Sequence, residues 1–319
     1  LLILLIFSIN DQADPMIEFS GTILGSSGAL PYKGRNLTSQ LVNYSGSLFL
    51  IDCGEGTQMQ LMKYKVRFMR INHIFISHLH GDHFYGLIGL VSTFHLLGRR
   101  DPLHIYGPAM LEEIIRLQLK ASLTSLVYSI TFHVVKDDAP VQIFEDERIV
   151  VTSFPMQHRI PTTGFLFAEK PFPRKINLEA TEKYEVPYTF FPELKIGADY
   201  CDAEGRIIDN EVLTTDPGKP RSFASCSDTS FFEALPGFIK GCDLMYHEAT
   251  FMNDMAVVAR EKMHSTSADA ANVAVLADAG RLLIGHFSAR YEHLGLLLEE
   301  AQRIFPSTEL AEEGKTYTL

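Results

Sequence analysis

The stretch Ser77-His78-Leu79-His80-Gly81-Asp82-His83 closes an apolar segment, 73–77, that predicts a short buried strand. Three imidazoles and one carboxylate stand within six positions, and Gly81 permits a tight turn between them. Imidazole and carboxylate together suit zinc, manganese or iron. Such a loop can direct His78 and His80 to one metal ion and Asp82 and His83 to a second. The alternative is a chance cluster on a polar loop, but this density is not typical of structural histidines.

Three further residues of metal-ligand type follow predicted strands at their carboxyl ends. They are His158 after 149–155, Asp228 after 222–226 and His286 after 282–284. Each alone has a simpler reading as a solvated or capping side chain, and Asp228 in particular would suit a helix N-cap. Together with the His-rich loop, these residues predict a single site for two metal ions.

The rest of the chain predicts a layered α/β domain. Of its 319 residues, 46% are apolar and 21% are charged, which excludes a disordered chain, a collagen and a coiled coil. Strand-like and helix-like apolar periods alternate along the sequence, as expected for packed sheets and helices. Further strands are predicted at 17–25, 47–52, 103–106, 127–135 and 243–246, and helices at 57–65, 86–97, 109–120, 265–277 and 293–303.

The net charge and the cysteine content limit the possible binding partners and the cellular compartment of the protein. The net charge of −11 argues against broad, nonspecific binding of nucleic acid, although it allows a local basic or metal site. The four cysteines are scattered and show no CxxC spacing, which favours a reduced, cytoplasmic protein. The apolar run 1–7 is too short to cross a bilayer, so we expect no membrane association. Residues 1–15 are interpreted as an uncertain N-terminal extension, with the working domain, 16–319, starting near Met16.

Residues 169–199 differ from the rest of the chain. They contain Pro171, Pro173, Pro187 and Pro192 among many Lys and Glu residues. This composition predicts an excursion from the core, and an ordinary surface loop with one helical turn is the alternative.

The His-x-His-x-Asp-His pattern at 78–83 resembles the metallo-β-lactamase superfamily, and further motifs are similar to those of its ribonuclease Z family, the tRNA 3′-processing endonucleases. The superfamily pattern alone is shared by lactamases, thioesterases and phosphodiesterases, whereas the late motifs are far more specific. The resemblance covers roughly 16–291. The motifs are LGSSGALP at 24–31 with Arg35-Asn36, IDCGEGTQ at 51–58, HEATF at 247–251, HSTS at 264–267 and HFSARY at 286–291.

This resemblance implies a four-layer αβ/βα sandwich of metallo-β-lactamase type with a protruding arm. It also implies two Zn²⁺ per subunit, which Mn²⁺ can replace, and a homodimer in which one subunit's arm serves the other's active site. The implied ligands are His78, His80 and His158 for one zinc, and Asp82, His83 and His286 for the other, with Asp228 bridging. The implied substrate is precursor tRNA, cut to leave a tRNA 3′-OH and a trailer with a 5′-phosphate.

Asp82 would be the general base, and His264 would donate a proton to the leaving 3′ oxygen, which suits a histidine near neutral pH. Glu248 would hold His264 in its working orientation; the alternative for Glu248 is a surface cap or ion pair. Ser288 and Arg290 are candidate phosphate contacts, although Arg290 also suits a structural ion pair.

Asp52 follows a predicted strand and would orient a ligand histidine, or simply form the turn before Gly54. His73, His95, His104, His133 and His293 belong to no motif and are interpreted as ordinary residues.

The arm departs from the family pattern. Its usual Gly-Pro-rich tip is replaced by the aromatic stretch 186–192, and its lysines and arginines are offset by glutamates. A phosphodiesterase acting on a smaller substrate would need no such arm and is the main alternative function. A noncatalytic metal-binding protein would be expected to lack a ligand or the proton donor, and this sequence has the full set.

Overall fold

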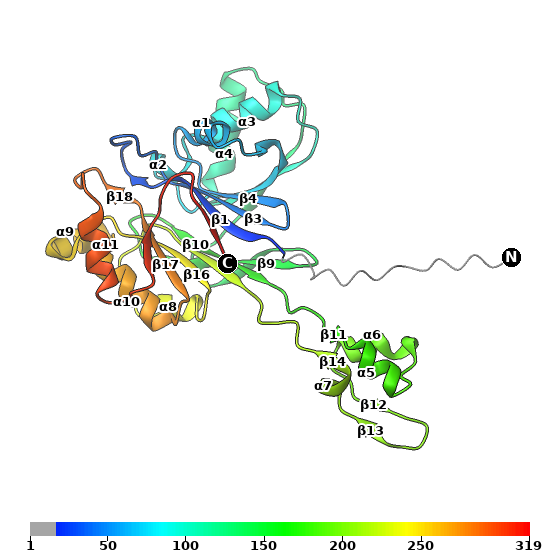
Figure 1. Ribbon diagram of the computed structural model, residues 1–319. Helices are drawn as coiled ribbons and strands as arrows, with labels where there is room; N and C mark the ends of the chain where they lie inside the picture. The colour runs from blue at the N-terminus through cyan, green and yellow to red at the C-terminus, as the bar shows by residue number, and fades with distance from the viewer. Residues whose placement is uncertain (1–16) are drawn as a thin grey trace.

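The computed structural model describes residues 17–319, so the predicted extension 1–15 and the start at Met16 lie outside the described residues. Two seven-stranded mixed sheets face each other (Figure 1). The first has the order β20 (Thr316–Thr318), β1 (Phe19–Gly25), β3 (Ser39–Tyr44), β4 (Ser47–Ile51), β5 (Ile71–Phe75), β6 (Leu103–Gly107) and β7 (Ile130–Val134). The second has the order β19 (Thr308–Leu310), β17 (Arg281–Gly285), β16 (Leu244–Glu248), β15 (Ser222–Cys226), β10 (Thr163–Glu169), β9 (Ile149–Pro155) and β8 (Val141–Glu145).

Helices cover the outer face of each sheet and complete the predicted four layers (Figure 1). On the first sheet these are α1 (Thr57–Lys63), α3 (Leu87–Leu96) and α4 (Met110–Ala121); on the second they are α8 (Leu235–Phe238), α10 (Ser267–Ala277) and α11 (Gly295–Gln302). Each set buries its apolar face against the sheet beneath it, which is why these segments carry helical periodicity. No helix in residues 17–319 is long and apolar enough to cross a membrane.

Aromatic side chains fill the space between the sheets. Phe49 and Phe75 from the first sheet meet Phe165 and Phe167 from the second, with ring centroids 5.4–5.6 Å apart. The central strands are buried on both faces, which explains their continuous apolar sequences. This aromatic core fixes the spacing of the sheets and therefore of the strand ends that carry the polar residues.

Most predicted elements are present, and two predicted strands, Ile149–Pro155 and Ser222–Cys226, match their observed bounds. The strand expected at 73–77 instead spans Ile71–Phe75. It ends early because the backbone N–H of Ser77 donates to Asp52 Oδ1, at 2.8 Å, and not to a neighbouring strand. Five strands of the two seven-stranded sheets were not predicted, namely β3, β8, β10, β19 and β20.

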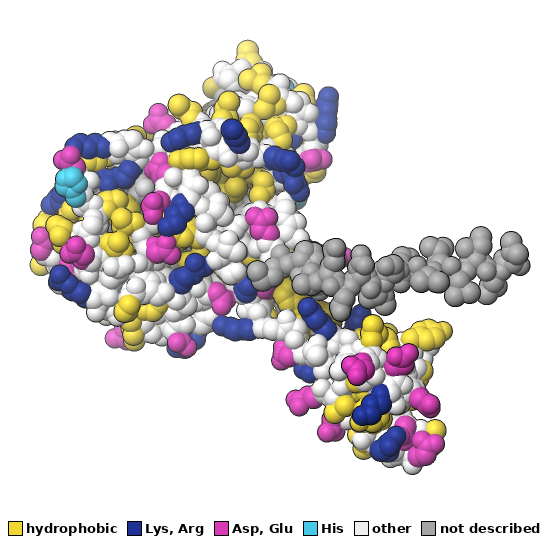
Figure 2. Space-filling view, in the orientation of Figure 1, with side chains coloured by type: hydrophobic (Ala, Val, Ile, Leu, Met, Phe, Trp, Pro, Cys, Tyr) yellow, Lys and Arg dark blue, Asp and Glu magenta, His cyan; other side chains and the backbone are white. Residues whose placement is uncertain are grey.

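A separate lobe projects from the second sheet between β10 and β15 (Figure 1). It contains β11 (Lys175–Ile176), α5 (Leu178–Lys183), α6 (Phe191–Lys195), β12 (Tyr200–Cys201), β13 (Ile207–Ile208), α7 (Asn210–Leu213) and β14 (Thr214–Thr215). Four buried side chains, Val186, Leu194, Ile208 and Leu213, form its own small core. Acidic and basic side chains are interspersed over its surface (Figure 2).

The predicted range 169–199 covers only the first part of this lobe. That boundary follows from the proline and charge composition of the sequence. The returning limb of the lobe, residues 200–215, pairs β14 with β11 and supplies two of the four buried side chains, Ile208 and Leu213. At the base of the lobe, Arg221 donates to Glu169 Oε1 at 2.6 Å, which ties the outgoing strand to the returning one.

Candidate metal centre

Seven predicted ligand residues, from loops that follow strands of both sheets, converge at one end of the sandwich. They are His78, His80, Asp82, His83, His158, Asp228 and His286, and they fall into two groups whose ligand atoms lie within 4.8 Å of one another. The His-rich loop enters the short helix α2 (Gly81–Phe84), which places Asp82 and His83 on its single turn. The geometry thus brings together every metal ligand predicted from the sequence.

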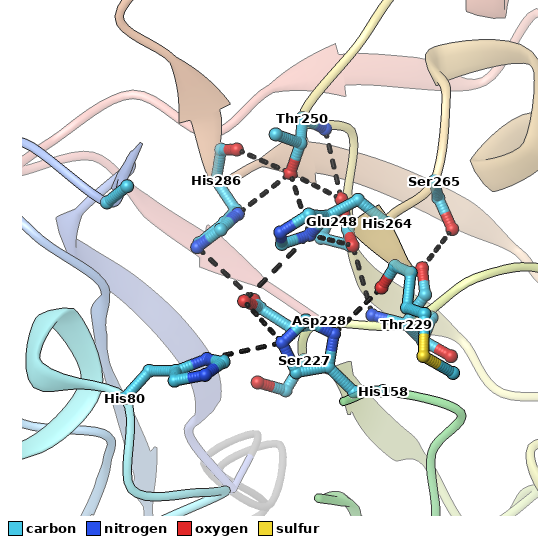
Figure 3. Close-up of polar contacts among 12 residues, drawn as sticks. His80, His158, Ser227, Asp228, Thr229, Glu248, Thr250, His264, Ser265 and His286 are labelled. Carbon is cyan, nitrogen blue, oxygen red and sulfur yellow. Dashed lines mark hydrogen bonds and ion pairs between the residues drawn. The ribbon is translucent and has the colours of Figure 1, made fainter. Parts of the chain in front are cut away.

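The first group consists of His78, His80, His158 and Asp228 (Figure 3, which labels all but His78). His80 Nδ1 lies 3.0 Å from His78 Nε2 and 3.2 Å from His158 Nε2. Asp228 Oδ2 lies 3.7 and 3.8 Å from the Nε2 atoms of His78 and His158. Four donors placed tetrahedrally at about 2.1 Å from a zinc ion are about 3.4 Å apart, so these separations suit zinc.

The second group consists of Asp82, His83 and His286, to which Asp228 presents its other oxygen. The Nε2 atoms of His83 and His286 are 3.3 Å apart, and Asp82 Oδ2 is 3.3 Å from His286 Nε2. Asp228 Oδ1 is 3.3 Å from His83 Nε2 and 3.2 Å from His286 Nε2. Each oxygen of Asp228 therefore faces a different group.

The chemistry of these donors fits cations. Asp228 Oδ1 is buried and has no hydrogen-bond partner, a costly state for a carboxylate oxygen unless positive charge lies beside it. Burial alone would lower the pKa of His83, yet Asp228, Asp52 and Asp82 raise it well above its usual value. The same negative field that favours a proton at this position favours a metal ion.

In four of these histidines a protein group contacts Nδ1, the ring nitrogen that points away from the cluster, an arrangement typical of metal ligands. Asp52 Oδ2 lies 2.7 Å from His83 Nδ1, so the predicted contact between Asp52 and a ligand histidine is present. Asp52 also forms the turn, at φ +55°. The corresponding partners are Ser77 Oγ for His78 (3.0 Å), the Met263 carbonyl for His158 (2.8 Å) and Thr250 Oγ1 for His286 (2.9 Å).

His264 lies at the edge of the cluster, against Glu248 (Figure 3). Its Nδ1 is 2.8 Å from Glu248 Oε1 and 3.9 Å from Asp228 Oδ2. Glu248 is fully buried, so the alternative of a surface cap is wrong, and it also accepts the backbone N–H groups of Thr229 and Thr250 at 3.0 Å. Burial lowers the pKa of His264, but Glu248 and then Asp228 outweigh it and raise the pKa to about 9.

The loop between β1 and β3 forms one wall of the site. The backbone N–H of Ala29 donates to Asp82 Oδ2 at 2.7 Å. The short strands β2 (Ser27–Gly28) and β18 (Phe287–Ser288) pair here, and a Cβ on Gly28 would lie 2.6 Å from the His286 ring. Only glycine therefore lets this loop approach His286 so closely.

Glu313, near the C-terminus, fastens the same loop. Its carboxylate accepts the Asn36 N–H at 2.6 Å, Asn36 Nδ2 at 2.8 Å and Gln60 Nε2 at 2.9 Å. Neither Glu313 nor Thr250 was singled out as a site residue from the sequence. Glu313 stands in no motif, and its contacts join segments brought together only by the crossing of the chain between the sheets. Thr250 belongs to the motif at 247–251, but the motif alone does not show that its hydroxyl contacts His286.

Ser288 and Arg290 lie beyond His286 on the same segment. The Arg290 backbone N–H donates to Ser288 Oγ at 3.3 Å, and its guanidinium carbon lies 5.7 Å from the centroid of the Phe251 ring. Arg290 is exposed, which leaves its guanidinium accessible to an anionic ligand.

A second set of histidines, His73, His104 and His133, lies on neighbouring strands β5, β6 and β7. The His73 and His104 rings stack at 5.1 Å, and His104 Nδ1 is 3.0 Å from His133 Nε2. Burial, followed by the two neighbouring imidazoles, lowers the pKa of His73 to about 4. We refer to these three residues as the stacked histidines.

The four-layer sandwich and its cluster of histidines and aspartates define a metal-dependent hydrolase of the metallo-β-lactamase fold. The metallo-β-lactamase fold protein YhfI from Bacillus subtilis superposes with a TM-score of 0.68 at 19% identity, over 95% of this chain and 100% of that one. Human tRNase Z, short form, gives a TM-score of 0.68 at 29% identity, over 93% and 98% of the two chains.

Sequence comparison is more specific. Ribonuclease Z from Bacteroides fragilis is 46% identical over 304 residues, which cover 95% of this chain and 100% of the relative. The chain belongs to the ribonuclease Z family, and the protein is a hydrolase of the endoribonuclease class. A family model described as Anti-Pycsar protein Apyc1 also matches residues 20–174, which contain the His-rich loop.

Proposed function

We propose that the protein is a zinc-dependent endoribonuclease that removes the 3′ trailer from precursor tRNA. The products would be a tRNA with a 3′-OH and a trailer with a 5′-phosphate. The observation that carries the proposal is the placement of the His264–Glu248 pair beside seven converging donors, in a chain 46% identical to a ribonuclease Z.

Two zinc ions, or Mn²⁺ in their place, fit the two donor groups. His78, His80 and His158 would hold one ion, Asp82, His83 and His286 the other, and Asp228 would bridge them through its two oxygens. When bound, the pair of ions supplies Lewis acidity that activates water near neutral pH and offsets phosphoryl charge.

The chain's own residues move the protons. Asp82, held by the Ala29 N–H at 2.7 Å, accepts the proton of the attacking water. His264 donates a proton to the leaving 3′ oxygen, and the buried Glu248 holds it through Nδ1 so that Nε2 remains free for the substrate. Ser288 and Arg290, at the rim, contact the phosphate, since a guanidinium can bind two of its oxygens at once.

The lobe between β10 and β15 is the proposed tRNA-binding arm, attached to a single domain that spans the rest of 16–319. Its mixed surface charge means that shape and aromatic contacts contribute to binding in addition to ion pairs (Figure 2). We propose a cytoplasmic homodimer in which each arm serves the partner's site. The cysteines, all unpaired in the structure, agree with a reducing compartment.

The test is cleavage of a precursor tRNA carrying a 3′ trailer, using full-length, metal-quantified protein. A single cut near the discriminator base is expected, and it should be lost with chelator and in Asp82→Ala. Asp137→Ala, in the exposed turn between β7 and β8, is the matched control and should cut normally. If the protein instead binds about two zinc ions, leaves the precursor intact and hydrolyses a simple phosphodiester, its substrate is a smaller phosphodiester.

A further inference from the structure

Two apolar side chains beside Asp82 are open to solvent. Tyr85 is 65% exposed and Leu30 is 62% exposed. Tyr85 follows α2, three residues after Asp82, and Leu30 follows Ala29, whose N–H binds the Asp82 carboxylate at 2.7 Å. Single exposed apolar residues are common on protein surfaces. These two differ because Tyr85 follows the helix that contains Asp82, the carboxylate proposed to accept the proton of water, and Leu30 follows the residue whose N–H binds that carboxylate.

The Tyr85 ring is held against the metal-binding turn. A Cβ built on Gly81 would lie 2.3 Å from Tyr85 Cε2 and 2.6 Å from Cδ2, so the side of the ring rests on this glycine. The ring also packs against Phe84, with centroids 4.9 Å apart, and the Tyr85 N–H donates to the Gly81 carbonyl at 3.0 Å. One part of the ring is thus fixed by the protein while the larger part faces solvent.

The backbone of Leu30 is equally well fixed. Ser27 Oγ donates to the Leu30 carbonyl at 2.7 Å, and the Leu30 N–H donates to the Gly28 carbonyl at 2.7 Å. Because Gly28 is in contact with His286, the position of Leu30 is coupled to the metal centre. We refer to these two exposed side chains, each held by a segment that also holds a group of the metal centre, as the apolar edge.

RNA supplies a suitable partner for such an edge. Cleavage requires an unpaired strand in the site, and the bases beside the scissile phosphate are then unstacked and expose their π faces. Aromatic side chains bind such bases by stacking, largely without regard to sequence. We propose that Tyr85, together with Leu30, forms a subsite for one of the two nucleobases that flank the scissile phosphate. This inference rests on the proposed function and assigns the subsite a ligand class, an unpaired nucleobase.

The proposal can be tested by a double-mutant cycle between Tyr85 and the substrate. Two precursor tRNAs are made, one abasic at the nucleotide 5′ of the cut and one at the nucleotide 3′ of it. For the wild type, one of these substrates should lower kcat/KM about tenfold, as expected for loss of one stacked base. For Tyr85→Ala, the intact substrate should show a similar loss, and the abasic change should add almost nothing.

Tyr85→Phe should behave as the wild type, because it retains the ring, and Leu30→Ala should show a smaller effect in the same direction. Leu123→Ala, at a 91% exposed position after α4, should keep the full abasic penalty. Zinc content and thermal melting of each variant establish that the site is intact. A full penalty in Tyr85→Ala, or no penalty in the wild type at either position, overturns the subsite. Failure of the wild type to cut the intact precursor overturns the proposed function, and the subsite with it.

Discussion

The molecule contains two groups of buried or half-buried histidines, and the imidazole rings serve different roles in the two groups. In the metal centre the rings point nitrogens at one another and at Asp228, whose Oδ1 lacks a hydrogen-bond partner. The stacked histidines instead lie face to face on adjacent strands, and His73 packs against the Phe144 ring at 4.5 Å.

Carboxylates account for the difference. Asp52, Asp82 and Asp228 surround His83 and favour positive charge there, whereas burial and neighbouring imidazoles keep His73 neutral. A histidine becomes a candidate metal ligand when polar groups orient its ring and nearby buried acids supply negative charge, and otherwise it serves as a flat packing group.

The largest effect is expected for Asp228→Ala. Each of its oxygens faces a different donor group, so removal should release at least one zinc per chain. kcat/KM should fall by on the order of 10⁴, since metal ions provide several kcal/mol of charge stabilisation. Zinc is counted by mass spectrometry, with His133→Ala from the stacked histidines as the control that should retain all metal. Full zinc content in Asp228→Ala would contradict the bridging role.

His264→Ala should retain both zinc ions yet lose turnover by about 10³, the usual size of a general-acid contribution. The measurement pairs single-turnover kinetics with zinc content. His264 also lies within ligand distance of Asp228 and His286. The zinc content of the variant therefore shows whether His264 is a proton donor or a metal ligand. Loss of zinc from this variant would place His264 among the ligands.

Glu248→Gln should have a smaller effect, a loss of about 10- to 100-fold in kcat with zinc retained, because it disturbs only the orientation of His264. The double variant with His264→Ala should be no slower than His264→Ala alone, since the two residues act as one unit. An additive loss would show that Glu248 acts through something other than His264.

The smallest effect is expected for His73→Phe, which should leave zinc content and cleavage unchanged. The folded-state pKa of His73, about 4, lies below the unfolded value of about 6.5, so the neutral form is favoured in the fold. Its contribution to stability is therefore complete above pH 6.5 and is lost as the pH falls towards 4.

Urea unfolding at pH 7.5 and 5.5 provides the measurement. The wild type should lose about 1 kcal/mol more than His73→Phe between these values. Equal losses in the two proteins would show that His73 is not held neutral by its surroundings.

The sequence predicted the site best where its residues lie close together in the chain. His78, His80, Asp82 and His83 share one turn, and the remaining ligands each follow a strand, so parallel-sheet geometry predicts their convergence. The contacts that support the site instead join residues far apart in the chain. Glu313 and Asn36 are 277 positions apart, and their contact depends on how the last strands cross between sheets.

The fold shows the same division. Strands with buried apolar faces, such as β9 and β15, were predicted to the residue. β20 has three residues with two exposed side chains, so its hydrophobic pattern is weak, and its pairing with β1 is a tertiary contact. The returning limb of the lobe, residues 200–215, was missed for a similar reason, because its apolar residues are few and pack only within the lobe.

Both donor groups draw on both sheets: His78, His80, Asp82 and His83 follow β5 of the first, and His158, Asp228 and His286 follow strands of the second. Nearly all strands of the first sheet precede the exposed turn at 136–140, and the second sheet follows it. A chain cut in that turn gives two fragments, neither of which contains a complete donor group. Zinc would then be retained only by the reassembled pair, and its retention would measure, without any substrate, how tightly the two pieces associate.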